Sequence, residues 1–92
     1  MAQVVITLRI MPSNIDVDLH ALEAKVKHEI VAFCNSQEFR ASIHPVAFGL
    51  KALQMIFVME ESKGSTEDLE NQIAKLSGVE SVEVTDVRRA IG

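Results

Sequence analysis

Hydrophobic and polar residues alternate along residues 3–11. The even-numbered positions from Val4 to Ile10 carry aliphatic side chains, whereas the odd-numbered positions include Thr7 and Arg9. Successive side chains of a strand point to opposite faces, so a period of two is typical of a strand with one buried face. The pattern therefore predicts a first strand over residues 3–11.

The period changes after Pro12, which has no amide hydrogen to donate to a sheet and so ends the strand. From residue 15 hydrophobic residues recur every three or four positions, which predicts one apolar stripe along a helix. Asp16 and Asp18 fall in its predicted first turn, where acidic side chains suit the helix dipole. Cys34 lies at the predicted end. The stripe consists of Ile15, Leu19, Leu22, Val26, Ile30 and Phe33.

Two further strands are predicted over residues 38–46 and 51–59, separated by a break at Phe48-Gly49. Pro45 excludes a central ladder position near the end of the first of these strands. The second is hydrophobic on both faces, which indicates a central strand or one whose outer face is covered.

The remaining residues predict a short helix and a last strand. Ser65 and Asp68 resemble a capping box, and Gly78 is a good residue to stop the helix that follows. The apolar stripe of this helix consists of Leu69, Ile73 and Leu76. Residues 79–87 form the last predicted strand, with Val82 and Val84 facing inward.

The predicted order of elements is βαββαβ, the ferredoxin-like arrangement. We therefore expect an α+β sandwich in which two helices cover one face of a four-stranded antiparallel sheet and leave the other face open. The length of 92 residues and the absence of an internal linker predict a single domain over residues 1–92.

Composition narrows the classes of function. The net charge is −4 and there is no Trp or Tyr, which argues against a direct nucleic-acid binder. No run of roughly 18 apolar residues could span a membrane, and the N-terminus lacks the features of a signal peptide. Cys34 is the single cysteine and cannot form an internal disulfide, so we expect a reducing, cytoplasmic location.

Residues that carry chemistry are few. His20 and His28 are too far apart on the first helix to share a metal ion, and His44 falls in a strand. Cys34 has no evident base partner, and no glycine-rich phosphate loop is present. We therefore expect no catalytic residue, metal or cofactor, and no enzyme.

Two features of the sequence are candidates for contact with another protein. Phe48, beside Gly49 in a turn, would form a hydrophobic knob suited to a partner's pocket, or would fold back over the core. Arg88 and Arg89 form a short basic tail. The topology allows the turn and the end of the last strand to lie at one end of the sheet, where together they would form a protein-docking edge.

Two segments resemble the signature segments of a known family. Residues 45–53 (PVAFGLKAL) and 78–89 (GVESVEVTDVRR) are similar to those of translation elongation factor 1-beta in its short archaeal form. The sequence after Met11-Pro12, with acidic residues at 16 and 18 and leucines at 19 and 22, is similar to the first loop and helix of that family. The resemblance extends over essentially the whole chain.

The resemblance implies a guanine nucleotide exchange factor for the GTPase elongation factor 1-alpha, acting in protein synthesis without covalent chemistry. In that family the aromatic residue of the Phe-Gly motif enters a pocket of the GTPase, a role that would fall to Phe48. A basic residue near the C-terminus approaches the magnesium site of the GTPase. Eukaryotic members have Lys there, and the matching residue here is Arg89, with Arg88 beside it. The candidate partner-binding residues are Phe48, Gly49, Leu50, Lys51, Asp86, Arg88 and Arg89.

A competing hypothesis comes from the hydrophobic outer face of residues 51–59. A ferredoxin-like regulator that senses a small molecule or a metal ion could oligomerise through such an open sheet face. Release of GDP from elongation factor 1-alpha would distinguish the two functions. The sequence leaves the oligomeric state open.

Overall fold

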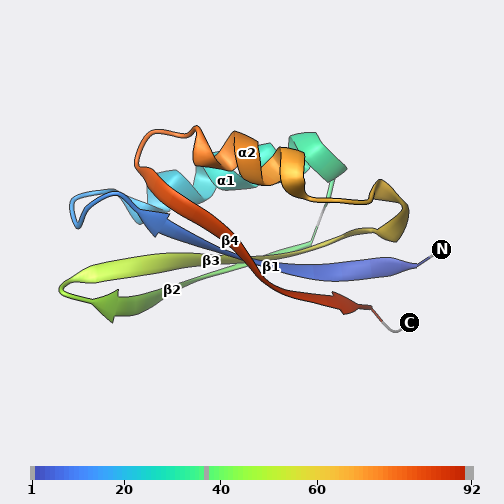
Figure 1. Cartoon of the computed structure of the whole chain (residues 1–92), viewed down its shortest axis with the longest axis horizontal. Helices are drawn as coiled ribbons and strands as arrows, with labels where there is room; N and C mark the ends of the chain where they lie inside the picture. The colour runs from blue at the N-terminus through green and yellow to red at the C-terminus, as the bar shows by residue number, and fades with distance from the viewer. Residues whose placement is uncertain (1, 37, 91–92) are drawn as a thin grey trace.

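The computed structural model describes residues 2–36 and 38–90, which form one antiparallel sheet covered on one face by two helices (Figure 1). The order of strands in the sheet is β2-β3-β1-β4, so β1 and β3 are central. The predicted α+β ferredoxin-like fold is confirmed. The elements are β1 (Gln3–Pro12), α1 (Leu19–Cys34), β2 (Phe39–Ala47), β3 (Leu50–Glu60), a 3-10 turn η1 (Glu61–Lys63), α2 (Glu67–Ala74) and β4 (Val79–Arg89).

The core lies between the helices and the inner face of the sheet, and it follows the predicted periodicities. The buried face of β1 is the even-numbered set from Val4 to Ile10, and it packs beneath Leu22, Val26 and Ile30 of α1. The other buried members are Leu53, Met55, Phe57, Met59, Leu69 and Ile73. Burial of these side chains joins the helices to the sheet. Neither described helix is long and apolar enough to cross a membrane.

The start of α1 differs from the prediction. The helix begins at Leu19 rather than at residue 15, and the carboxylate of Asp18 accepts hydrogen bonds from the amides of His20 (3.0 Å) and Ala21 (3.2 Å). Asp18 is therefore the N-cap of the helix and does not belong to its first turn. Aspartate is among the residues that the N-cap position favours most strongly. Asp16 and Ile15 lie in the loop before the helix, and the side chain of Ile15 is 64% exposed.

The start of α2 also differs from the predicted capping box. The N-cap is Thr66, whose hydroxyl donates to the Glu70 carboxylate (2.8 Å), while the Ser65 hydroxyl accepts from the Glu67 amide (3.0 Å). Among the hydrogen bonds of the described residues, none joins Asp68 to the cap. Because Glu70 is longer than Asp68, its carboxylate can fold back to the cap hydroxyl one turn earlier.

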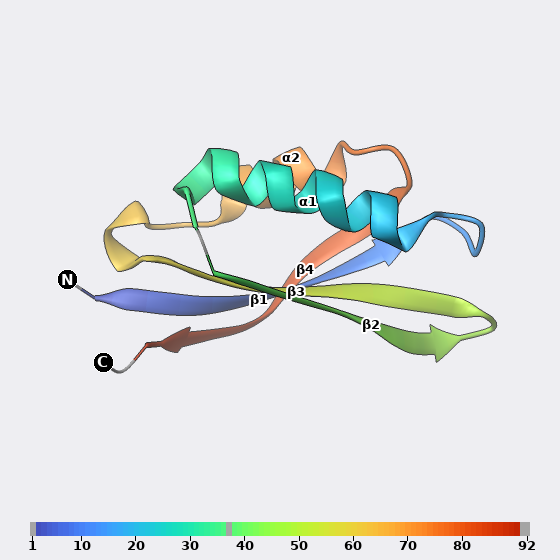
Figure 2. The ribbon, with the colours of Figure 1, turned by 180° about the vertical axis from the view of Figure 1, so that it is seen from behind.

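The two edge strands, β2 and β4, carry the residues that are typical of sheet edges, a proline in β2 and exposed charged side chains in β4. Pro45 lies in β2, which is an edge strand, and the register of β2 on β3 shifts between Pro45 and Ala47. On the other edge, β4 carries Val82 and Val84 against the core while Glu83 is exposed. The reverse view in Figure 2 shows both helices on the same side of the sheet, so the other face of the sheet is open.

Candidate functional site

The turn between β2 and β3 presents Phe48 to solvent. Ala47 pairs with Leu50, so Phe48 and Gly49 form a two-residue hairpin loop. Both have positive φ values, 52° at Phe48 and 81° at Gly49. This is the pattern of a type I′ turn, which matches the twist of the strands and usually has Asn-Gly in the loop. Gly49 adopts it without strain, whereas a left-handed conformation costs a residue such as Phe about 1 kcal/mol.

The exposure of Phe48 sets it apart from the other phenylalanines of the chain. Phe57 is buried in the core, and Phe33 and Phe39 are half-buried, each with a lysine ammonium over its ring at 4.8 Å and 5.2 Å. Phe48 is 99% exposed. The sequence left open whether Phe48 is exposed or folds back over the core, and in the structure it is exposed. Its exposed ring contributes nothing to the packing of the described residues, so Phe48 stays a candidate for contact with a partner.

The two arginines of the tail lie on opposite faces of β4. Arg88 pairs with Val5, on the open face, and Arg89 pairs with Val4, on the face covered by helices. Arg88 Nε lies 2.8 Å from the carboxylate of Asp86. Arg89 binds Glu61 with two hydrogen bonds, from Nε (3.1 Å) and from a terminal nitrogen (2.8 Å). Because adjacent residues of a strand alternate, the two guanidinium groups cannot reach the same small site together.

The contact with Glu61 was missed by the sequence analysis. Glu61 begins the 3-10 turn after β3, and its amide donates to the Ala2 carbonyl (3.0 Å). The hydrogen bonds from Arg89 lower the pKa of the Glu61 carboxyl below its ordinary value. Only the sheet topology brings these residues together, so no local sequence signal indicated the pair.

The structure corrects the predicted docking edge, because the hairpin and the arginine tail lie at opposite ends of the sheet (Figure 1). Both β3 and β4 are antiparallel to β1, so they run in the same direction. The hairpin starts β3, while Arg88 and Arg89 end β4. Arg88 is level with Val58 across β1. At about 3.3 Å per residue, the stretch of β3 from Leu50 to Val58 separates the two groups by roughly 26 Å.

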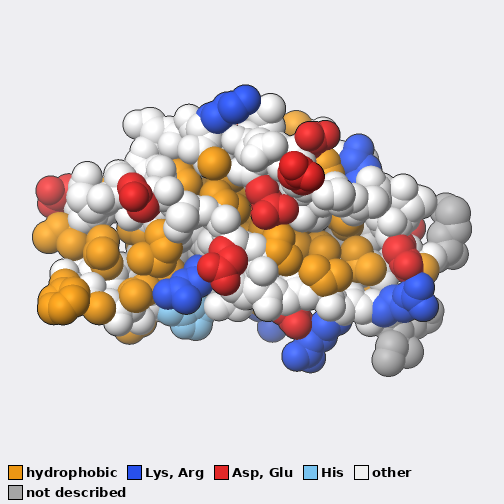
Figure 3. Space-filling model, viewed as in Figure 1, with side chains coloured by type: hydrophobic (Ala, Val, Ile, Leu, Met, Phe, Trp, Pro, Cys, Tyr) orange, Lys and Arg blue, Asp and Glu red, His pale blue; other side chains and the backbone are white. Residues whose placement is uncertain are grey.

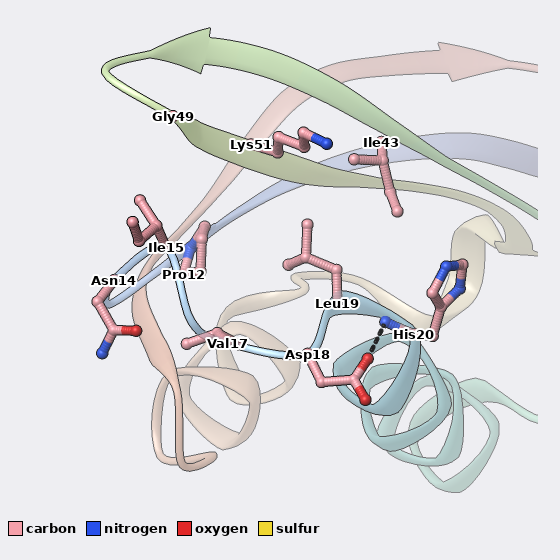
Figure 4. A pocket seen from close by; sticks show the side chains of 10 residues that line it. All are labelled: Pro12, Asn14, Ile15, Val17, Asp18, Leu19, His20, Ile43, Gly49 and Lys51. Carbon is pink, nitrogen blue, oxygen red and sulfur yellow. Dashed lines mark hydrogen bonds between the residues drawn. The ribbon is translucent and has the colours of Figure 1, made fainter.

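The other candidate residues also lie at one or the other of these two ends of the sheet. Leu50 and Lys51 begin β3 beside Phe48 and Gly49, while Asp86 lies near Arg88 on β4. Figure 3 shows hydrophobic side chains gathered at the hairpin end of the molecule. A hollow of about 350 Å³ lies beside the hairpin, and Gly49 and Lys51 are part of its wall (Figure 4). The candidate residues therefore fall into a mainly apolar group at the hairpin and an ion-paired group at the end of β4.

The titratable residues outside these two ends form no evident reaction centre. The three histidines are exposed, and no group of three or more His, Cys, Asp or Glu residues in residues 2–36 and 38–90 could hold a metal ion. The Cys34 thiol lies 3.4 Å from the Ile30 carbonyl, and burial raises its pKa. A raised pKa disfavours the thiolate, the form that reacts as a nucleophile.

Comparison with known proteins gives the family. The model of the EF-1 guanine nucleotide exchange domain matches residues 5–90. Elongation factor 1-beta of Methanobrevibacter smithii is 46% identical over 89 residues, covering 97% of this chain and 98% of the relative. The proteins of the same description from Staphylothermus marinus and Methanococcoides burtonii are 42% and 41% identical, and each alignment covers at least 97% of both chains.

Solved structures show the same fold at low sequence identity. A de novo designed protein, Foldit4, has a TM-score of 0.62 at 20% identity and covers 98% of both chains. The C-terminal domain of the MgtC protein from Mycobacterium tuberculosis has a TM-score of 0.55 at 16% identity, covering 97% of this chain and 88% of that one. Both likenesses concern the fold alone, because one fold serves many functions.

The fold and the family match together define the class of this protein as a ferredoxin-like nucleotide exchange module. The chain belongs to the EF-1 guanine nucleotide exchange domain family, with elongation factor 1-beta proteins of archaea as its relatives. It is a nucleotide exchange factor, and the competing hypothesis of a sensor regulator is not supported.

Proposed function

We propose that this chain, acting as one exchange domain in the cytoplasm, promotes the exchange of GDP for GTP on elongation factor 1-alpha through non-covalent contacts. The proposal rests mainly on one observation: the chain exposes a fully accessible phenylalanine on a strained turn in a domain of the EF-1 exchange family. Aromatic anchors that fill a partner's pocket supply a large share of the binding energy in protein interfaces.

The hairpin end acts as the anchor in this mechanism. Phe48 inserts into a pocket of the GTPase, and burial of its ring contributes about 2 kcal/mol or more. The turn is closed by the pairing of Ala47 with Leu50, so the backbone beneath the ring is already ordered and mainly the side chain loses freedom on binding. Lys51 adds a positive charge at the edge of the same contact.

The arginine end acts on the site that holds the nucleotide. A guanidinium group near the magnesium site of the GTPase competes with the cation and attracts the carboxylates and phosphates that it binds. In the free protein Arg89 is paired with Glu61 and Arg88 with Asp86. Docking therefore exchanges an internal carboxylate partner for one on the GTPase, which keeps the net cost of the charge contact small.

The separation of the two ends restricts how the GTPase is bound. Both contacts can form together only on a partner whose pocket and magnesium site are also about 26 Å or more apart, by the same strand rise. A factor that binds the nucleotide-free form more tightly weakens nucleotide binding by the same free energy, because linkage is reciprocal. A thousandfold loosening of GDP requires about 4 kcal/mol of such differential binding.

Release of a fluorescent GDP from elongation factor 1-alpha tests the proposal. With an excess of unlabelled nucleotide, the release rate is expected to rise with the concentration of this chain. The increase should be the same whether GDP or GTP is the chasing nucleotide, because an exchange catalyst accelerates both directions. A release rate that does not change at any concentration of the chain would refute the proposal.

A further inference from the structure

The loop between β1 and α1 lies against the β2–β3 hairpin. A Cβ atom placed on Gly49 would lie 3.6 Å from Cγ2 of Ile15, so the exposed Ile15 side chain adjoins the turn that carries Phe48. The loop is held in place by its own hydrogen bonds. The Asn14 side chain accepts from the Asp16 amide (2.9 Å), and the Ser13 amide donates to the Gly78 carbonyl (2.9 Å).

The hollow between the loop and the hairpin has a mixed lining, in which apolar side chains lie beside Asn14, Asp18, His20 and Lys51. Pro12, Val17, Leu19 and Ile43 line it, and in Figure 4 the side chains of Leu19 and Ile43 point towards each other across the space. A volume of about 350 Å³ is sufficient for one large side chain of another protein. The hollow is thus a recess with an apolar part, formed by Pro12, Val17, Leu19 and Ile43, and it lies beside the exposed side chains of Ile15 and Phe48.

The charged residues around the hollow indicate which kind of polar group on a partner could lie beside it. The Asp18 carboxylate already accepts two amide hydrogen bonds at the start of α1. The Lys51 ammonium forms no hydrogen bond or ion pair with any of the described residues. A partner segment with an apolar side chain and a nearby carboxylate or carbonyl group would therefore satisfy both the recess and the lysine.

We propose that Ile15 and this hollow form the second half of the surface that docks the GTPase. This inference rests on the proposed function and extends it to the loop between β1 and α1, which lies outside the two signature segments at residues 45–53 and 78–89. Ile15 packs beside Phe48 on the GTPase, and the hollow receives an apolar side chain from it. The support is continuity: a Cβ on Gly49 would touch Ile15, and Ile15, Gly49 and Lys51 all line the hollow. Anchors of an interface cluster in this way, surrounded by contacts that exclude water.

Two substitutions test the inference, with a matched control at the other end of the sheet. Ile15→Ser removes the exposed anchor, and Leu19→Phe fills the hollow. Val87→Ser is the control, because Val87 is also exposed (56%) but lies on β4 beside the arginines. Release of fluorescent GDP from elongation factor 1-alpha is measured at limiting concentrations of each variant. Melting temperatures are measured in parallel.

Each of the two test variants is expected to lower the exchange rate about tenfold, the effect of losing an interface contact of ordinary strength. The Val87→Ser control is expected to stay within about twofold of the wild type. Exchange at the wild-type rate by Ile15→Ser, or by a folded Leu19→Phe, would overturn the inference, and so would an equal loss in the control. If the wild-type chain itself fails to accelerate release, the proposed function fails instead.

Discussion

The two ends of the sheet are built on different physical principles. The hairpin end exposes apolar side chains that the described residues leave largely uncovered, with Phe48 at 99% and Ile15 at 64% exposure. The other end carries charges that are already paired, Arg88 with Asp86 and Arg89 with Glu61. When a partner covers the apolar end, the whole free energy of burying those side chains contributes to binding. At the charged end, binding gains only the difference between the ion pairs within the chain and those with the partner. In the mechanism that we propose, the hairpin supplies the affinity and the arginines supply the selectivity for the nucleotide site.

Replacing Phe48 should produce the largest effect. Phe48→Asn places the residue that type I′ turns favour before Gly49, so the melting temperature is expected to stay the same or to rise. Exchange activity should fall by about thirtyfold or more, the loss typical of a central aromatic anchor. The two readouts are GDP release and thermal unfolding. An Asn variant that keeps the wild-type rate of exchange would remove Phe48 from the docking surface.

Replacing the arginines separately should produce a smaller effect and identify which of them acts. The two side chains lie on opposite faces of β4, so one of Arg88→Ala and Arg89→Ala should reduce exchange several-fold and the other should have little effect. The active arginine should also account for most of the dependence of exchange on salt concentration, because salt screens exposed charges. Full activity of the double variant would exclude the basic tail from the mechanism.

Removing the ion pair between Glu61 and Arg89 should produce the smallest effect, a shift in the pKa of the Glu61 carboxyl. Since the pKa of the Glu61 carboxyl in the folded state is lowered, the pair stabilises the fold above the ordinary pKa of 4.5 and is lost as the pH falls through the lowered value. An NMR titration of the carboxyl carbon should have its midpoint below 4.5 in the wild type. In Arg89→Ala the midpoint should return towards 4.5. Identical midpoints in the two proteins would show that the pair does not form in solution.

Periodicity predicted the elements well because each strand and each α-helix turns one face toward the core, fully buried in β1 and β3 and partly buried in β2 and β4. The alternation that ends at Pro12 and the stripe from Leu22 to Ile30 correspond to the core of the structure. The stripe was extended wrongly to Ile15, because a hydrophobic residue at the right spacing can also lie in an exposed loop. Asp18 was the available signal, since an acidic residue before an apolar repeat favours the N-cap.

The candidate site was predicted in its parts but not in its arrangement. Phe48 and Gly49 are adjacent in the sequence, so the hairpin could be recognised as a unit. The distance from the hairpin to Arg89 depends on the directions of β3 and β4, and the partner of Arg89 lies 28 positions away in the sequence. Long-range pairings of this kind follow from the topology and not from local patterns. The hollow beside Ile15 likewise forms only where the loop meets the hairpin.

The affinity of this chain for the two states of elongation factor 1-alpha tests the central claim most directly. Titration calorimetry with the nucleotide-free GTPase and with the GDP-bound GTPase measures the differential binding on which exchange depends. We expect the nucleotide-free form to be bound more tightly by up to about a thousandfold, equivalent to about 4 kcal/mol. Equal affinity for the two forms would contradict the account, because a ligand that binds both states equally cannot displace GDP.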